Sequence, residues 1–152
     1  MQKQLISLLI ALCFINNEAA LIAQELNVQV SRNNLIKMGL QKYIVGEPHV
    51  AINPANPDHL LIGAMLVNPN DKTDGPCVAF HSNDRGKTWT YNIFKHKNAA
   101  DAWCAINKNG EAVFSLLGEE KMFVYHSKDG GKTWTDSTDL GKNHDHEAMT
   151  TA

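Results

Sequence analysis

The sequence contains one long apolar run, little net charge and no cluster of basic residues. The apolar run, residues 5–15, is about half the ~20 residues that a membrane-spanning helix needs, so no permanent membrane anchor is expected. The formal net charge is −2, and basic and aromatic side chains do not interleave. Nucleic acid is therefore not an expected partner, and no cofactor is expected.

The first residues have the order of a secretory signal peptide. Lys3 precedes the apolar run, and small residues follow it as far as Ala23. We therefore predict a leader at 1–23 and a secreted, periplasmic or cell-surface location. Cys13 lies inside this leader, and Leu12 before it fits a bacterial lipoprotein processing site poorly. The remainder, roughly 130 residues, suits one modest domain.

Cysteine is scarce after the predicted leader: residues 24–152 contain only Cys77 and Cys104. An exported protein meets an oxidising compartment, in which two thiols can pair. The sequence gives no distance between them. A disulfide and a pair of buried free thiols therefore both stay open.

A stretch of ten residues occurs twice with few changes. HSNDRGKTWT spans 81–90 and HSKDGGKTWT spans 126–135, so their serines are 127 − 82 = 45 residues apart. Upstream, EPHVAIN (47–53) resembles DAWCAIN (101–107), and a third start follows at DHEAMTT (145–151). The chain is therefore built on an internal repeat.

Each repeat is predicted to form four short strands. Short alternating or apolar runs are broken by Gly, Pro, Asn and Asp, and the apolar spacing is not helical. Four strands in about 45 residues is the period of a β-propeller blade. We therefore predict an all-β protein of four-stranded antiparallel blades. The expected strands are 48–53, 59–66, 77–82 and 88–94 in the first unit, and 102–107, 111–117, 121–127 and 133–137 in the second.

The predicted organisation follows from these units. It consists of the leader at 1–23, an N-terminal segment with an outer strand at 24–46, a first blade at 47–100, a second blade at 101–144 and the start of a third at 145–152.

The repeated stretch has the composition of a tight hairpin. Asp84 can accept hydrogen bonds from backbone N–H groups just downstream, and Gly86 suits the positive φ that hairpin turns often require. Trp89 supplies a large apolar surface to bury against neighbouring strands. The second copy repeats these residues.

The hairpins match the pattern S-x-D-x-G-x-T-W, which resembles the Asp-box, or bacterial neuraminidase repeat, of sialidases and related propellers. The resemblance implies a β-propeller whose boxes are structural and remote from the ligand. A propeller needs at least about four blades, so the chain is expected to be the N-terminal part of a longer one. Self-assembly of several copies into a ring is the alternative, and we favour it less. The matching residues are Ser82, Asp84, Gly86, Thr88 and Trp89, and then Ser127, Asp129, Gly131, Thr133 and Trp134.

Ligand-binding residues are expected at the opposite ends of the strands from the boxes. Successive connections in an antiparallel sheet alternate between its two ends, so loop 67–76 and the linkers 94–101 and 139–147 open together. Long loops on a rigid scaffold commonly bind ligands. The candidates there are Asp71, Asp74, Lys95, His96, Lys97, Asp101, His144 and Asp145.

Arginine is too scarce for sialidase chemistry. Sialidases hold the sugar carboxylate with three arginines and also use a Tyr–Glu pair and an acid/base Asp. This chain has only Arg32 and Arg85, and its tyrosines match no nucleophile motif. The resemblance places Asp71 or Asp74 roughly where the acid/base Asp precedes the first box. The chain alone is therefore expected to be inactive.

His144 and His146 form a second candidate cluster. Alternating on a strand, they could hold a metal ion together with a carboxylate. Alternatively they open the third unit, because Asp145 aligns with Asp101.

Two functions follow from the sequence. One is a truncated sialidase-like exo-glycosidase that acts on or binds glycans. The other is a secreted, non-catalytic propeller module that binds a glycan, a cell-surface glycoconjugate or a protein through its loops.

Overall fold

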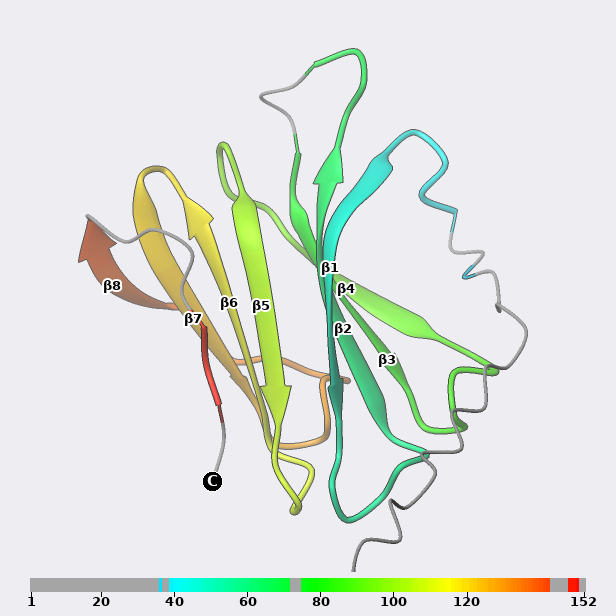
Figure 1. The fold of residues 1–152 in the computed structure, drawn as a ribbon. Coiled ribbons are helices and arrows are strands. Elements are labelled where there is room, and N and C mark those ends of the chain that lie inside the picture. Colours follow the sequence, from blue (N-terminus) through cyan, green and yellow to red (C-terminus); the bar gives the residue numbers. More distant parts are fainter. Residues whose placement is uncertain (1–35, 37–38, 72–74, 143–147, 151–152) are drawn as a thin grey trace, which may run out of the picture. The chain divides into compact units, whose positions relative to one another are not determined.

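The computed structural model describes residues 36, 39–71, 75–142 and 148–150, which lie in the compact unit Asn34–Ala152. These residues are all-β, without a helix, and form two four-stranded antiparallel sheets (Figure 1). The predicted leader, the strand expected at 25–31 and most of the expected third unit lie outside the described residues.

Each sheet is a simple meander in which every strand pairs with the next one along the chain. The first sheet contains β1 (Ile44–Ile52), β2 (Leu60–Val67), β3 (Cys77–Ser82) and β4 (Thr90–Phe94). The second sheet contains β5 (Ala100–Ile106), β6 (Ala112–Gly118), β7 (Lys121–Ser127) and β8 (Thr138–Lys142). The prediction of an all-β chain with four strands in each repeat is therefore confirmed for the described residues.

The predicted position of the eighth strand, 133–137, is wrong. Thr135 N donates to His126 O at 2.9 Å, which is the pairing that the first copy predicts. Two residues earlier in β7, however, Val124 pairs with Thr138, whereas the corresponding pair β3–β4 of the first sheet keeps one register throughout. The outer strand therefore carries one extra residue, a β-bulge, before regular pairing begins.

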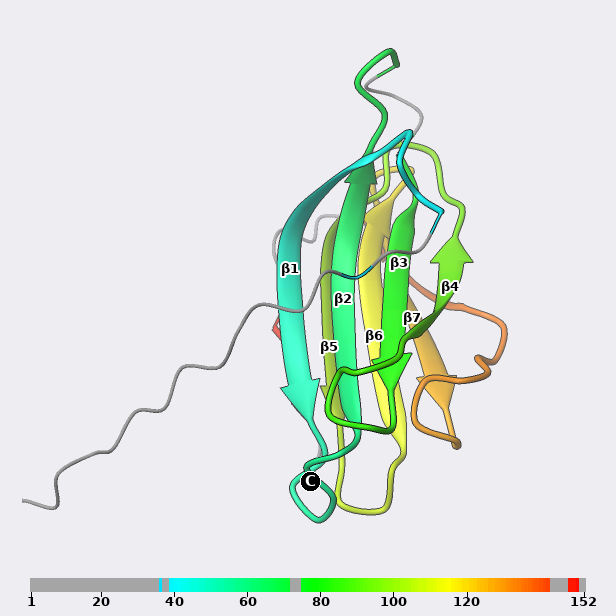
Figure 2. The ribbon, with the colours of Figure 1, turned by 90° about the vertical axis from the view of Figure 1, so that its right-hand side faces the viewer.

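The two sheets pack through one shared core. Phe94 of β4 stacks on Phe114 of β6 with ring centroids 4.4 Å apart. The same cluster of buried side chains includes Leu61 and Ala79 from the first sheet and Leu116 from the second. Figure 2 shows the strands of the first sheet side by side, with β5 to β7 behind them. Burial of these side chains at about 25 cal/mol per Å² is the main force that joins the sheets.

The sheets stack front to back. Leu61 of β2 lies in the shared core. His81 and His126 are the same residue of the repeated stretch. Leu61 pairs with His81 and Val113 pairs with His126, so Val113 holds in β6 the place that Leu61 holds in β2. Val113 alternates with Phe114, which faces the core, and so lies on the far face of the second sheet. The face that is packed in the first sheet is therefore turned away from the interface in the second.

The other face of the first sheet is apolar and only partly covered. Phe80 lies there in a small cluster against which Leu40 and Trp89 pack. By register, Val50 and Ile52 share this face, and their side chains are 58% and 55% exposed. Both sheets therefore leave one face with no complete partner among the described residues.

Trp134 joins the two sheets, whereas Trp89 does not. Trp134 lies edge-on to both Phe94 and Phe114, which come from different sheets. Trp89 packs only on the outer face of the first sheet.

We expect Trp134→Ala to lower the free energy of unfolding by about 3 kcal/mol and Trp89→Ala by about 1 kcal/mol, as measured by urea denaturation. Each tryptophan also donates to its own hairpin, so that loss is common to both variants. An equal or larger loss for Trp89→Ala would contradict this packing.

Candidate functional site

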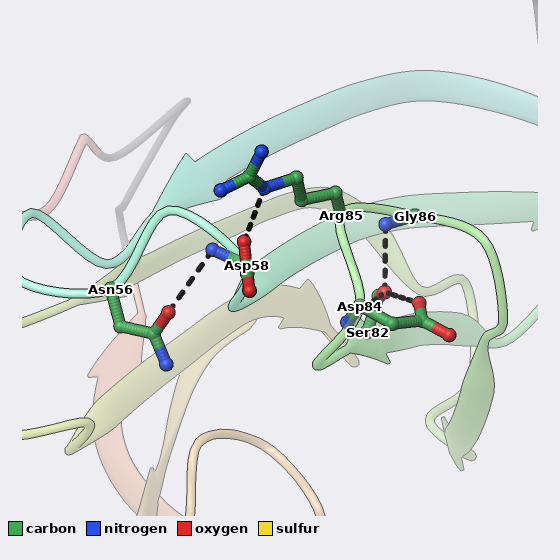
Figure 3. Close-up of polar contacts among 6 residues, drawn as sticks. All are labelled: Asn56, Asp58, Ser82, Asp84, Arg85 and Gly86. Carbon is green, nitrogen blue, oxygen red and sulfur yellow. Dashed lines mark hydrogen bonds and ion pairs between the residues drawn. The ribbon is translucent and has the colours of Figure 1, made fainter.

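The two repeated hairpins, 82–89 and 127–134, have the same hydrogen bonds. Figure 3 shows Ser82, Asp84 and Gly86 of the first hairpin. Ser82 Oγ donates to Asp84 Oδ1 at 2.8 Å and accepts from Gly86 N at 2.9 Å. Thr88 donates to the Asp84 carboxylate through both its backbone N and its hydroxyl, at 2.8 and 2.6 Å. The second hairpin repeats each of these bonds to within 0.1 Å. The aspartates therefore stabilise the turns of the two hairpins.

The electrostatics of the hairpins agree with a structural role. Hydrogen bonds from Thr88 lower the pKa of Asp84 to about 2. Burial acts to raise the pKa of Asp129, but the hydrogen bonds from Thr133 and Ser127 outweigh it and bring the value to about 2. Both carboxylates are ionised at neutral pH and so cannot serve as general acids.

Arg85 lies at this hairpin end as well. Its guanidinium forms an exposed ion pair with Asp58, in the turn between β1 and β2 (Figure 3). Its backbone N also donates to Asp58 O at 3.0 Å. This arginine therefore fastens one turn of the first sheet to the next.

The remaining connections gather at the opposite ends of the strands. The β2–β3 loop, the β4–β5 linker and the β6–β7 turn lie at the upper side of the view in Figure 1, together with the start of β1. This arrangement follows from the antiparallel meander. Side chains from these connections form the candidate functional site.

A cavity of about 230 Å³ opens at this loop end. Lys95 and His96 come from the linker between the sheets, Pro76 from the end of the β2–β3 loop, and Lys42 and Tyr43 from the residues before β1. Lys42 Nζ lies 4.5 Å from the centre of the Tyr43 ring, a cation–π contact. The cavity therefore combines two cationic side chains with an aromatic ring.

His96 connects the cavity wall to a half-buried tyrosine. His96 Nε2 lies 2.6 Å from Tyr125 OH, and Nδ1 lies 4.0 Å from a Glu119 carboxylate oxygen. The imidazole stacks on Phe123 and its side chain is only 13% exposed. Burial lowers the pKa of His96, although Glu119 opposes this, and burial raises the pKa of Tyr125. At neutral pH the pair is uncharged, so it suits hydrogen bonding to a ligand rather than nucleophilic attack.

Two carboxylates occupy corresponding bulges near the loop end. Glu47 lies in the bulge of β1 and Asp101 in that of β5, each with φ near +50°. Both act electrostatically on Cys77, and with burial they raise its pKa to about 12. Glu47 and Asp101 therefore lie near the same thiol, although neither lines the cavity.

Cys77 and Cys104 are both buried free thiols, so the predicted alternative of a disulfide is not formed in this structure. Burial raises the pKa of Cys104 to about 12 as well. Cys104 Sγ lies 3.4 Å from His49 O on the neighbouring sheet. The thiols therefore serve as small core residues.

The structure brings together only part of the predicted site. Lys95 and His96 line the cavity, whereas Asp71 lies in an exposed turn, bridged to Asn68. The remaining candidates of that list, together with His146, are placed as follows: Asp101 lies in the β5 bulge and Lys97 in the linker, and Asp74, His144, Asp145 and His146 lie outside the described residues. Among the residues that are described, no group of three or more His, Cys, Asp or Glu side chains could hold a metal ion.

Sequence reasoning missed Lys42, Tyr43, Tyr125 and Glu119 as site residues. The first two precede the repeat, so no second copy marks them. Tyr125 could have been found from alternation along 121–127, which places it on the same face as Phe123.

Comparison with known proteins does not assign the chain to a family. No protein-family model matches it, and no curated protein matches it. Within the described residues, no helix has the length and apolar character needed to cross a membrane.

The buried thiols should be inert in the folded protein. With a pKa of about 12, each cysteine has about 1,000-fold less thiolate at neutral pH than one at its ordinary value of 9.0. In a Cys13→Ser protein we expect no reaction with a disulfide reagent until urea is added, and then two thiols per chain. Lys108→Cys, at an exposed turn, is the positive control and should react at once. Fewer than two thiols after unfolding would instead indicate a disulfide.

Proposed function

We propose that the two sheets are consecutive blades of an exported, sialidase-like Asp-box propeller. Three observations support this proposal. The hairpins 82–89 and 127–134 share one hydrogen-bond pattern, the sheets stack front to back, and the connections alternate between a hairpin end and a loop end. The leader-like residues 1–23 favour export.

The function that we propose is binding of an acidic glycan in the loop-end cavity. The observation that carries this proposal is the pairing of two lysines with one aromatic ring around a space of about 230 Å³. Lys42 and Lys95 would attract a carboxylate as point charges. Tyr43 offers a ring face for the apolar side of a sugar, and His96 offers a hydrogen bond. The volume suits one sugar unit rather than a drug-sized ligand.

Glycoside hydrolysis is the second candidate, and Glu47 and Asp101 favour it. Glycosidases generally use two carboxyl groups that flank the bond to be cleaved. These two residues occupy corresponding bulges and influence the same thiol. Binding is preferred because neither carboxylate lines the cavity and because Arg85, the only arginine among the described residues, lies at the other end of the strands.

Charge on the cavity wall should control glycan binding. We expect calorimetry to show tighter binding of sialyllactose than of neutral lactose. Lys95→Glu should weaken the binding of sialyllactose about tenfold, because a hydrogen bond to a charged group contributes about 1.5–3 kcal/mol. Lys108→Glu makes the same change of charge at an exposed turn of the hairpin end and should leave the affinity unchanged. Equal affinity for both sugars, or equal weakening by both variants, would refute the proposal.

Hydrolysis should be absent from this chain alone. A fluorogenic sialoside should stay uncleaved above the background rate, since no arginine clamp faces the loop end among the described residues. Asp71→Asn and Asp74→Asn provide the check on the two predicted acid/base candidates. Turnover that either substitution abolishes would establish the enzyme and displace the binding function.

A further inference from the structure

The second hairpin, 127–134, fits closely into a site on the first sheet. Gly130 O lies 3.0 Å from His59 Nε2, and Asn92 Nδ2 donates to Gly131 O at 3.1 Å. A Cβ on Gly130 would lie 1.9 Å from the His59 ring, and one on Gly131 would lie 2.7 Å from Leu61. This hairpin site of the first sheet, formed by His59, Leu61 and Asn92, therefore admits only glycine at both positions.

The second sheet carries the corresponding backbone. Asn53 N donates to His59 O at 3.0 Å in the first sheet, and Asn107 N donates to Glu111 O at 2.9 Å in the second. Glu111 therefore occupies the place of His59. The register of β6 and β7 likewise places Val113 where the first sheet has Leu61.

In the second sheet this site is an open cavity. Its volume is about 230 Å³, and its lining includes Glu111, Val113, His126 and Lys128. Residues 148–150, which reach Trp103 through a hydrogen bond from its indole Nε1 to Met149 O, do not line it. Among the described residues, no segment fills this hairpin site of the second sheet (Glu111, Val113 and His126), which is the counterpart of a contact that the molecule already makes once.

The residues that differ between the two sites indicate what would fill the second. Arg85 in the first hairpin, 82–89, holds the position of Gly130 in the second, and both have positive φ, 60° and 75°. His59 leaves no room for a side chain at that position. Its counterpart Glu111 is an exposed carboxylate, and the side chain of Arg85 is 69% exposed. The site with His59 requires glycine at the tip of the hairpin, whereas the site with Glu111 has a charge opposite to that of Arg85.

We propose that a second copy of this chain docks its first hairpin, 82–89, into the hairpin site of the second sheet, with Arg85 against Glu111. The Arg85 Nε binds Asp58 of its own chain, and the guanidinium carries further N–H donors for a second carboxylate. This inference depends on the stacking of the sheets and not on glycan binding.

The faces that would meet match as well. In the contact that exists, the face of the second sheet bearing Phe114 packs on the face of the first sheet bearing Leu61. The counterpart of the Phe114 face is the outer face of the first sheet, where Val50 and Ile52 are exposed. Docking of a second copy would cover this apolar face with the far face of the second sheet, which bears Val113.

Such a contact joins two different surfaces, so each copy can bind the next. Interfaces of this kind close into rings when the rotation fits. Propellers contain about four to eight blades. With two sheets in each copy, a closed ring would contain about two to four copies.

Light scattering of the full chain over a range of concentrations tests the proposal. We expect a mass two to four times that of one chain, which falls to the single-chain value in Arg85→Glu and in Glu111→Arg. The double variant, in which the charges are exchanged, should recover the assembly. Glu120→Arg is the matched control, because it makes the same charge change at an exposed loop-end position and should assemble as the native chain does.

A mixture of Arg85→Cys and Glu111→Cys chains should form a disulfide between copies, and circular dichroism should show that every variant remains folded. A monomer at all concentrations would overturn the proposal and leave a further hairpin of the same type within one polypeptide as the occupant. Equal loss of assembly in Glu120→Arg, or failure of the double variant to recover it, would also overturn it.

Discussion

A carboxylate enclosed within one turn is the interaction on which the rest of the structure depends. In each hairpin the aspartate accepts two hydrogen bonds from one threonine and one from a serine. These bonds hold the backbone in the positive-φ turn that positions the following tryptophan, whose indole donates back into the same hairpin. A turn fixed in this way is a rigid projection, and a rigid projection can be fitted closely by the neighbouring sheet. The contact of Gly130 with the ring of His59 is such a fit.

The hairpins and the cavity lie at opposite ends of the strands. The hairpins form the β3–β4 and β7–β8 connections, and the meander sends the β2–β3, β4–β5 and β6–β7 connections to the other ends of the strands. Within the β4–β5 linker, Lys95 lines the cavity, while His96 lines it and also stacks on Phe123 of the second sheet. The cavity with Lys95 and His96 lies there, while Arg85 remains tied to Asp58 at the hairpin end. A cationic binding site can thus form in a chain with a small negative net charge.

The repeat made most of the fold predictable, because two aligned copies show both the strand pattern and the turn chemistry. Prediction failed where the copies differ: one extra residue before β8 changes its register against β7, and the strand spans Thr138–Lys142 instead of 133–137. Two of the five residues that line the cavity could not be predicted, since Lys42 and Tyr43 belong to no repeat and reach the loop end only through the fold. The state of the cysteines needed coordinates, because spacing in the chain says nothing of the distance between buried side chains.

Differences between corresponding positions carry information that identities do not. Identical residues in the two hairpins, such as the paired aspartates and tryptophans, report what any copy needs in order to fold. The first sheet has His59 where the second sheet has Glu111, and the first hairpin has Arg85 where the second hairpin has Gly130. The two copies therefore differ both in the hairpin and in the hairpin site. Because His59 leaves no room for a side chain at the Gly130 position, the first hairpin with Arg85 cannot take the site that the second hairpin fills, and this restricts the order in which such sheets can stack.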